Sequence, residues 1–127
     1  MPRNMSFSLT TQQIRERTKD VTRRLGWANL KAGQRLNACR KCQGLRPGEA
    51  IERLALIEVV SVLRLRLDSI TQDDVRREGF TNMTASEFVA MFCEHMKVDP
   101  TTTVTRIEFR YVDEPAADIV APKRKPR

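Results

Sequence analysis

Two kinds of segment are missing from this sequence of 127 residues. No apolar run reaches the roughly 20 residues that a membrane-spanning helix needs, and the first residues lack the apolar stretch of a secretory signal. Cysteine is scarce, with three residues in the chain, which argues against a disulfide framework. We therefore expect a cytoplasmic protein without a membrane partner, and the composition (40% hydrophobic, 31% charged) predicts a soluble globular fold.

Several well-known functional motifs are absent as well. The sequence contains no glycine-rich phosphate loop, no HExxH or GxSxG motif and no EF-hand loop. We also find no internal repeat. The function therefore has to be sought in the distribution of charge and in less common motifs.

Basic residues are concentrated in the first third of the chain. Residues 1–46 carry 11 Lys and Arg against two acidic residues, whereas residues 47–112 carry eight against 11. A basic region on a mildly acidic body is typical of a surface that faces a polyanion, so RNA or a nucleoside is the predicted partner. The alternatives are a solvated basic face without a partner and a face that binds an acidic host protein.

The residue patterns predict one α+β domain over residues 1–112 and a flexible basic tail over residues 113–127. Strands are expected at 18–25, 35–39, 51–66 and 103–112. Helices are expected at 11–17, at 71–77 and at 88–96. This order favours a small, mostly antiparallel sheet that curls into a barrel with helices at its ends.

Some boundaries have specific signals. Thr71 is the expected N-cap of one helix, and Thr84 with Glu87 has the spacing of a capping box for the next. Residues 51–66 are long for a single strand, so we expect a bulge or bend near Val60 and Ser61.

The densest cluster of reactive residues is the stretch 17–24, RTKDVTRR. A turn between Lys19 and Thr22 would bring the ammonium group to the hydroxyl. This matters because a threonine hydroxyl is a weak nucleophile until a neighbouring base or cation assists it. The alternative is a basic edge strand with a solvated threonine.

The stretch 17–24 resembles the Gly-x-Lys-x-x-Glu/Thr-x-Arg signature of the ASCH domains, relatives of the PUA fold. Further similarity lies at residues 30–36, 78–80, 84–88 and 105–109, so that it covers about residues 5–112. It is closest to the small stand-alone members of bacteria and their phages. The resemblance implies a small PUA-like β-barrel of mostly antiparallel strands with short flanking helices.

The resemblance also implies a catalytic set. Thr22 stands where many members have Glu, which is similar to the subgroup that hydrolyses N4-acetylcytidine with a Lys, a Thr and a later Glu. The matching residues are Lys19, Thr22 and Glu78. Thr22 would attack the acyl carbonyl, Lys19 would assist deprotonation or stabilise the oxyanion, and Glu78 would carry the proton to the leaving amine. Other ASCH relatives imply RNA binding or RNA cleavage instead, so a ribonuclease and a non-enzymatic interaction protein are the alternatives.

Five residues are predicted to bind the nucleic acid or nucleoside: Arg17, Arg23, Arg24, Trp27 and Lys31. Arg24 is the expected arm for a base or phosphate because its planar fork suits such groups. Trp27 could stack on a base, or could simply pack over the end of the barrel. Arg17 stands where the signature has Gly, a residue that permits a left-handed backbone.

A second hypothesis concerns zinc. Cys39 and Cys42 have the spacing of a zinc half-site, and Cys93 with His95 could supply two more ligands. The alternative is that Cys93 packs in the core, that His95 lies on the surface and that the CxxC spacing is accidental.

Overall fold

The computed structural model describes residues 2–42 and 45–113, so nearly all of the predicted tail lies outside the described residues. The strands are β1 (Arg3–Ser6), β2 (Val21–Arg24), β3 (Arg35–Cys39), β4 (Arg53–Arg66) and β5 (Thr103–Tyr111). The helices are α1 (Thr11–Arg15), α2 (Gln72–Arg77) and α3 (Ala85–Met96), and the 3-10 turns are η1 (Ser8–Thr10) and η2 (Leu67–Ser69). Among the described helices, none is long and apolar enough to cross a membrane.

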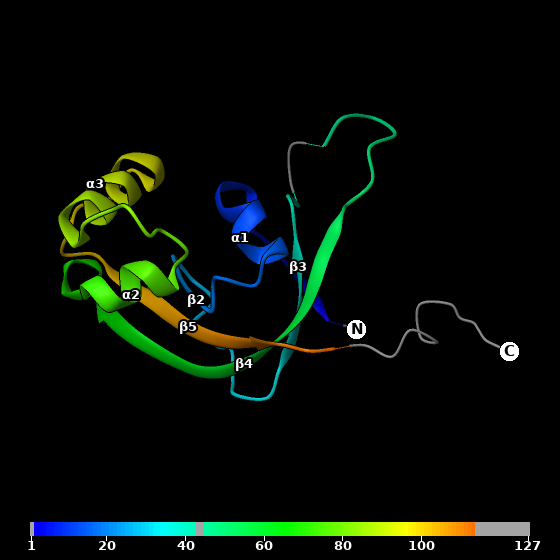
Figure 1. Ribbon diagram of the computed structural model, residues 1–127, viewed down its shortest axis with the longest axis horizontal. Helices are drawn as coiled ribbons and strands as arrows, with labels where there is room; N and C mark the ends of the chain where they lie inside the picture. Colours follow the sequence, from blue (N-terminus) through cyan, green and yellow to red (C-terminus); the bar gives the residue numbers. More distant parts are fainter. Residues whose placement is uncertain (1, 43–44, 114–127) are drawn as a thin grey trace, which may run out of the picture.

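The five strands form one curled sheet in the order β1-β3-β4-β5-β2 (Figure 1). Only the β1–β3 pair is parallel, and the remaining pairs are antiparallel. The long strand β4 pairs with both β3 and β5. This architecture confirms the predicted α+β class with a mostly antiparallel, barrel-like sheet.

A bulge interrupts β4 where the sequence indicated one. Val59 pairs with Phe109, but Ser61 pairs with the next residue, Glu108, so Val60 is the extra residue. A bulge bends its strand and increases the local twist. It therefore helps β4 to follow the curl of the sheet over 14 residues.

Both predicted helix caps are confirmed. The Thr71 hydroxyl accepts a hydrogen bond from the Asp74 amide at 3.1 Å at the start of α2. At the start of α3, Thr84 and Glu87 exchange the two hydrogen bonds of a capping box.

Three differences from the predicted elements lie in the first 25 residues. Strand β1 was not predicted; it has four residues, and its partner β3 lies more than 30 positions away. Helix α1 ends at Arg15, and Arg17 adopts a left-handed backbone with φ of 60° that cannot continue it. Strand β2 begins only at Val21; the Asp20 carbonyl accepts from the Phe109 amide of β5, but its amide donates to the Arg77 carbonyl at the end of α2.

Two apolar clusters fill the fold. The first lies in the curl of the sheet against α1, and its members are Met5, Phe7, Ile14, Leu30, Leu36, Ala38, Ile57, Val59, Ile107 and Phe109. The second packs α2 and α3 against the far ends of β4 and β5, and its members are Leu67, Ile70, Val75, Phe88, Phe92 and Val104. Strand β2 and the polar residues around it lie between these clusters (Figure 1).

Candidate active site

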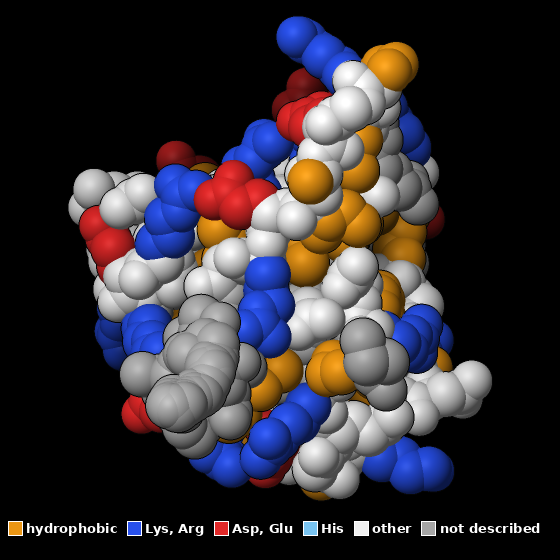
Figure 2. Space-filling model, turned by 90° about the vertical axis from the view of Figure 1, so that its right-hand side faces the viewer, with side chains coloured by type: hydrophobic (Ala, Val, Ile, Leu, Met, Phe, Trp, Pro, Cys, Tyr) orange, Lys and Arg blue, Asp and Glu red, His pale blue; other side chains and the backbone are white. Residues whose placement is uncertain are grey.

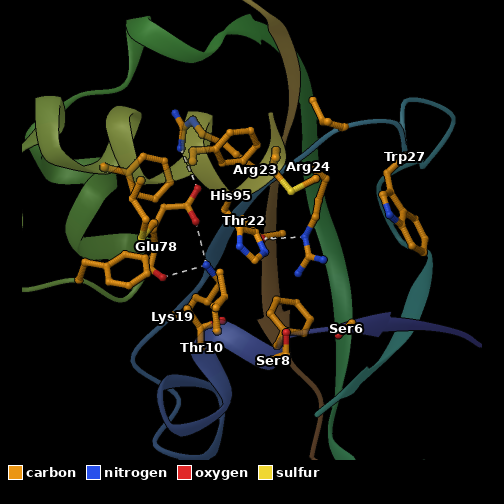
Figure 3. Close-up of a pocket in the computed structure, with 18 residues that line it drawn as sticks. Ser6, Ser8, Thr10, Lys19, Thr22, Arg23, Arg24, Trp27, Glu78 and His95 are labelled. Atoms are coloured by element: carbon orange, nitrogen blue, oxygen red, sulfur yellow. Dashed lines mark hydrogen bonds and ion pairs between the residues drawn. The ribbon is translucent and has the colours of Figure 1, made fainter. Parts of the chain in front are cut away.

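A pocket of about 450 Å³ lies beside the two edge strands of the sheet. Its lining comes from the end of β1, turn η1, strand β2, the chain after α2 and one face of α3 (Figure 3). Lys19, Thr22 and Glu78 all line it, although Glu78 is 59 positions from Lys19. The structure therefore brings the three predicted catalytic residues to one pocket.

Lys19 and Glu78 form a buried ion pair. The Lys19 Nζ donates to Glu78 Oε1 at 2.8 Å and to the Glu78 carbonyl at 2.8 Å. Their side chains are 3% and 4% exposed. Burial lowers the pKa of Lys19 below its ordinary value, while the adjacent Glu78 carboxylate acts in the opposite direction. A lysine whose pKa is lowered by burial is more readily available as a base.

The end of α2 and the residues that follow it are held against residues 19 and 20 by several contacts. The Asp20 amide donates to the Arg77 carbonyl at 3.0 Å, and the Arg77 guanidinium contacts the Asp20 carboxylate at 3.0 and 3.1 Å. Gly79 has a φ of 105°, and a Cβ placed there would lie 2.8 Å from Cγ of Gln13. The absence of a side chain at Gly79 therefore lets α1 approach closely and keeps Glu78 beside Lys19.

Arg23 lines the pocket, but its guanidinium is paired with two carboxylates. It is 5% exposed, and its terminal nitrogens contact Glu78 Oε2 at 3.2 Å and Asp74 Oδ2 at 2.7 Å. Arg106 contacts the same Asp74 carboxylate at 2.7 and 3.1 Å, and together Arg106 and Arg23 hold the pKa of Asp74 down at about 2. That Arg23 binds nucleic acid stays a prediction, and its charge is already paired with two buried carboxylates.

Thr22 is paired with Arg24 rather than with Lys19. Alternate residues of a strand share a face, and Arg24 Nε donates to the Thr22 hydroxyl oxygen at 3.1 Å. The Arg24 guanidinium also lies over the ring of Phe7, 4.6 Å from its centroid. No hydrogen bond joins Lys19 to Thr22 within the described part of the chain. A donor on the hydroxyl oxygen stabilises the alkoxide, so Arg24 is placed to activate Thr22.

The remaining predicted binding residues are dispersed. Trp27 lines the pocket, with the Arg3 guanidinium 4.3 Å from the centroid of its ring. Arg17 lies outside the pocket, where it contacts Asp113 at 2.8 Å and covers the ring of Tyr111. Lys31 is exposed in the loop before β3 and does not line the pocket. Of the five residues, the pocket receives Arg23, Arg24 and Trp27.

The four predicted zinc ligands do not come together. Cys39 ends β3, where the neighbouring Cys42 thiol contributes to raising its pKa, whereas Cys93 and His95 belong to α3. Among residues 2–42 and 45–113, no group of three or more His, Cys, Asp or Glu side chains could hold a metal ion. The two half-sites lie on separate elements, so the predicted four-ligand zinc site is not formed.

His95 instead belongs to the pocket. It is the single histidine of the sequence, it lies in the last turn of α3, and its side chain lines the same cavity as Thr22 (Figure 3). The sequence analysis assigned it to zinc as a possible partner, with Cys93, of the CxxC pair Cys39 and Cys42. The signal that it faces a pocket is its position on the helix face that also carries Phe88, Phe92 and Met91.

Many of the described basic residues outside the pocket lie beside acidic ones. Figure 2 shows Lys and Arg side chains spread over the face that it views, several of them beside acidic side chains. Exposed ion pairs account for several of them, including Arg15 with Glu52 and Arg40 with Glu49. The excess positive charge of residues 1–46 is thus largely distributed among ion pairs.

Solved structures that are similar to this chain include the following three. A protein from Enterococcus faecalis of the DUF984 family superposes with a TM-score of 0.62 at 19% identity, covering 89% of this chain and 77% of that one. An ASCH domain from Lactobacillus crispatus superposes with a TM-score of 0.57 at 13% sequence identity. The match covers 85% of this chain and 77% of that one. The hypothetical protein PH0355 superposes with a TM-score of 0.62 at 13% sequence identity. The match covers 88% of this chain and 100% of that one.

No protein-family model and no curated protein matches the sequence. The three structures are less than 20% identical to this chain, so the likeness is one of fold. It extends over nearly all of the described residues and includes the curled sheet that carries the pocket. The chain therefore has the fold of an ASCH domain, as the motif in residues 17–24 implied.

Proposed function

We propose that this protein hydrolyses the amide bond of an acylated cytidine in the pocket beside β2. The observation that carries this proposal is the convergence of a buried lysine–glutamate pair, a threonine and an arginine on one cavity. Buried charges with shifted pKa values in a concave site are typical of catalytic machinery. The residue types match the Lys, Thr and Glu of the cytidine deacylases that the motif resembles.

The size and lining of the cavity suit a flat base. A volume near 450 Å³ is within the range of small-molecule sites, roughly 300–1,000 Å³. Trp27, Phe80 and Phe88 contribute aromatic surface, and Arg24 contributes donors. Bases stack on aromatic rings and are oriented by a few polar groups, so this combination favours a nucleoside.

In the proposed reaction Lys19 first gives a proton to Glu78, and the Thr22 oxygen attacks the acyl carbonyl carbon as its own proton passes to the amine of Lys19. The carbonyl oxygen becomes an oxyanion beside the Arg24 guanidinium. The C–N bond then breaks, and the leaving nitrogen takes the proton from Lys19. Water attacks the acyl ester of Thr22 as Lys19 takes a proton from it. Lys19 returns this proton to the Thr22 oxygen as the carboxylic acid leaves, and Glu78 then returns its own proton to Lys19. Glu78 holds Lys19 in place and assists its proton transfers.

One observation favours a second candidate, an RNA- or nucleoside-binding domain without catalysis. Thr22 is hydrogen-bonded to Arg24 and has no such bond to Lys19 within the described residues. A reaction therefore needs Lys19 or the substrate to move until base and nucleophile meet. A binding domain needs no such movement, and Arg24 with Trp27 would be sufficient to orient a base.

Turnover of N4-acetylcytidine, followed by chromatography, separates the two candidates. We expect wild type to release cytidine and Thr22→Val to lose activity by about 100-fold or more, because the isosteric variant lacks the nucleophile. Thr18→Val is the matched control: Thr18 lies outside the pocket, and its exposed hydroxyl makes a 3.4 Å contact with the Gln13 carbonyl.

Loss of activity in Lys19→Met and Glu78→Gln, with cytidine binding retained, would support the assigned roles. Wild-type protein that binds cytidine or RNA but releases no product would favour the binding domain. Cleaved RNA with intact nucleoside would favour a ribonuclease instead.

A further inference from the structure

Arg24 differs from Lys19 and Arg23, which also line the pocket, in its lack of an acidic partner among the described residues. Lys19, Arg23 and Arg106 each contact a carboxylate at 2.8 Å or less. Arg24 forms no ion pair with any carboxylate in the described ranges 2–42 and 45–113. The described wall of the pocket therefore contains a positive charge that the protein itself does not neutralise.

The guanidinium of Arg24 is held in place while its two terminal nitrogens stay available. Its Nε is bound to Thr22, and its planar face lies over Phe7. The terminal nitrogens have no hydrogen-bond partner in the part of the chain that the structure describes. Figure 3 shows the side chain extending from β2 along the pocket wall, beyond Thr22. Two parallel N–H donors on a fixed plane are the geometry that binds an oxyanion in bidentate fashion.

One further observation supports a ligand at this position. Burial lowers the pKa of Arg24 to about 10, against the opposing effect of Glu78, which indicates a charge poorly compensated for its removal from water.

We propose that the pocket binds ligands that carry an oxyanion, a phosphate or a carboxylate, against the terminal nitrogens of Arg24. This inference rests on the proposed function for the pocket and deepens it, since the acylated cytidine would carry an additional anionic group. Two positions of the oxyanion fit this chemistry. It belongs either to the phosphate of a nucleotide or to a carboxylate on the acyl group.

Binding measurements with matched ligand pairs test the inference without any need for turnover. Cytidine 5′-monophosphate is compared with cytidine, and succinamate is compared with the neutral butyramide. The Kd follows from the rise in Tm over a ligand series at low ionic strength. We expect one anionic ligand to bind about 10-fold or more tightly than its neutral analogue, since charge-assisted hydrogen bonds are stronger than neutral ones. The pair that shows the gain identifies the source of the oxyanion.

Variants of Arg24 test whether this residue causes the tighter binding of the anionic ligand. Arg24→Gln should abolish it, and Arg24→Lys should keep a part of it, because lysine retains the charge but not the fork. Arg110→Gln removes an exposed arginine that contacts Glu58 at 3.1 Å outside the pocket, and should leave the gain unchanged. Circular dichroism verifies that each variant is folded.

The inference would be overturned if wild type bound each anionic ligand no more tightly than its neutral analogue. It would also be overturned if Arg24→Gln kept the full preference for the anionic ligand. The wild-type comparison decides the matter even if a variant does not fold. Because the readout is binding, an absence of hydrolysis would overturn the proposed reaction alone. Hydrolysis of N4-acetylcytidine with no preference for anions would overturn this inference alone.

Discussion

Two glutamates of this protein have the same kind of partners in opposite surroundings. Glu78 lies between Lys19 and Arg23 in the pocket wall, and Glu58 lies between Arg35 and Arg110 on the sheet surface. The two basic partners of Glu78 are 3% and 2% exposed, whereas those of Glu58 are 51% and 56% exposed. The distances are similar, from 2.8 to 3.2 Å. The comparison shows that the number of ion pairs says little until their burial is known.

The largest difference is expected when each glutamate is removed. Glu78→Ala leaves Lys19 and Arg23 charged and buried without this partner, which should lower the free energy of unfolding by about 3–5 kcal/mol. Glu58→Ala leaves two exposed arginines in water and should change stability little. Urea denaturation of the two variants measures both effects. Equal losses would contradict the view that burial determines the contribution of these pairs.

A second test displaces Glu78 without changing its charge. Gly79→Ala places a methyl group 2.8 Å from Gln13 at a φ of 105°, and should cost about 2 kcal/mol or more, from the left-handed strain together with the clash. Gly33→Ala is the matched control, with a φ of 93° and open space around it, and should cost about 1 kcal/mol from strain alone. Thermal unfolding measures both. Similar losses would mean that close packing at Gly79 does not position the ion pair.

The pH dependence of stability gives a third test. The pKa of Asp74 is held at about 2, below its ordinary value of 3.8, by Arg106 and Arg23. A carboxyl with a depressed pKa in the folded state contributes stability that is present above pH 4 and lost as the pH falls toward 2. Asp74→Asn should therefore show a smaller fall in Tm than wild type over this range. Asp68→Asn, which removes an exposed partner of Arg66, should retain more of the wild-type fall.

The smallest effect is expected at an exposed pair. Arg17 contacts Asp113 at 2.8 Å, but its backbone is left-handed with φ of 60°. Arg17→Gly removes a surface contact that contributes little and relieves the strain, so stability should be unchanged or rise by up to about 1 kcal/mol. Arg17→Ala keeps the strain and should bring no rise. A clear loss in Arg17→Gly would show that an exposed ion pair can contribute as much as backbone strain.

Much of the fold could be predicted because its signals are local. The hydroxyl of Thr71, the capping box of Thr84 and Glu87, and the alternation along β5 depend on residues within a few positions of each other. The bulge at Val60 follows from strand length. Strand β1 could not be predicted in this way, because four residues that pair in parallel with a distant strand have no pattern of their own.

The candidate site could be predicted only in part, because its residues are far apart in the sequence. Spacing within 17–24 identified Lys19 and Thr22, but Glu78 came only from resemblance to a family. Charge alone could not show that Arg23 is buried against two carboxylates while Arg24 has none. The zinc hypothesis did not hold because the spacing of cysteines in the sequence does not reveal which elements the fold brings together.

The pairing of β2 with β5 also has a consequence for synthesis on the ribosome. Residues 21–24 leave the exit tunnel early, but their partners are residues 105–108. Because domains fold as their contacts become available, the wall that holds Thr22 and Arg24 cannot form until almost the whole described chain has emerged. A truncated nascent chain would therefore have no pocket, and the activity proposed for it would arise only once β5 has been translated.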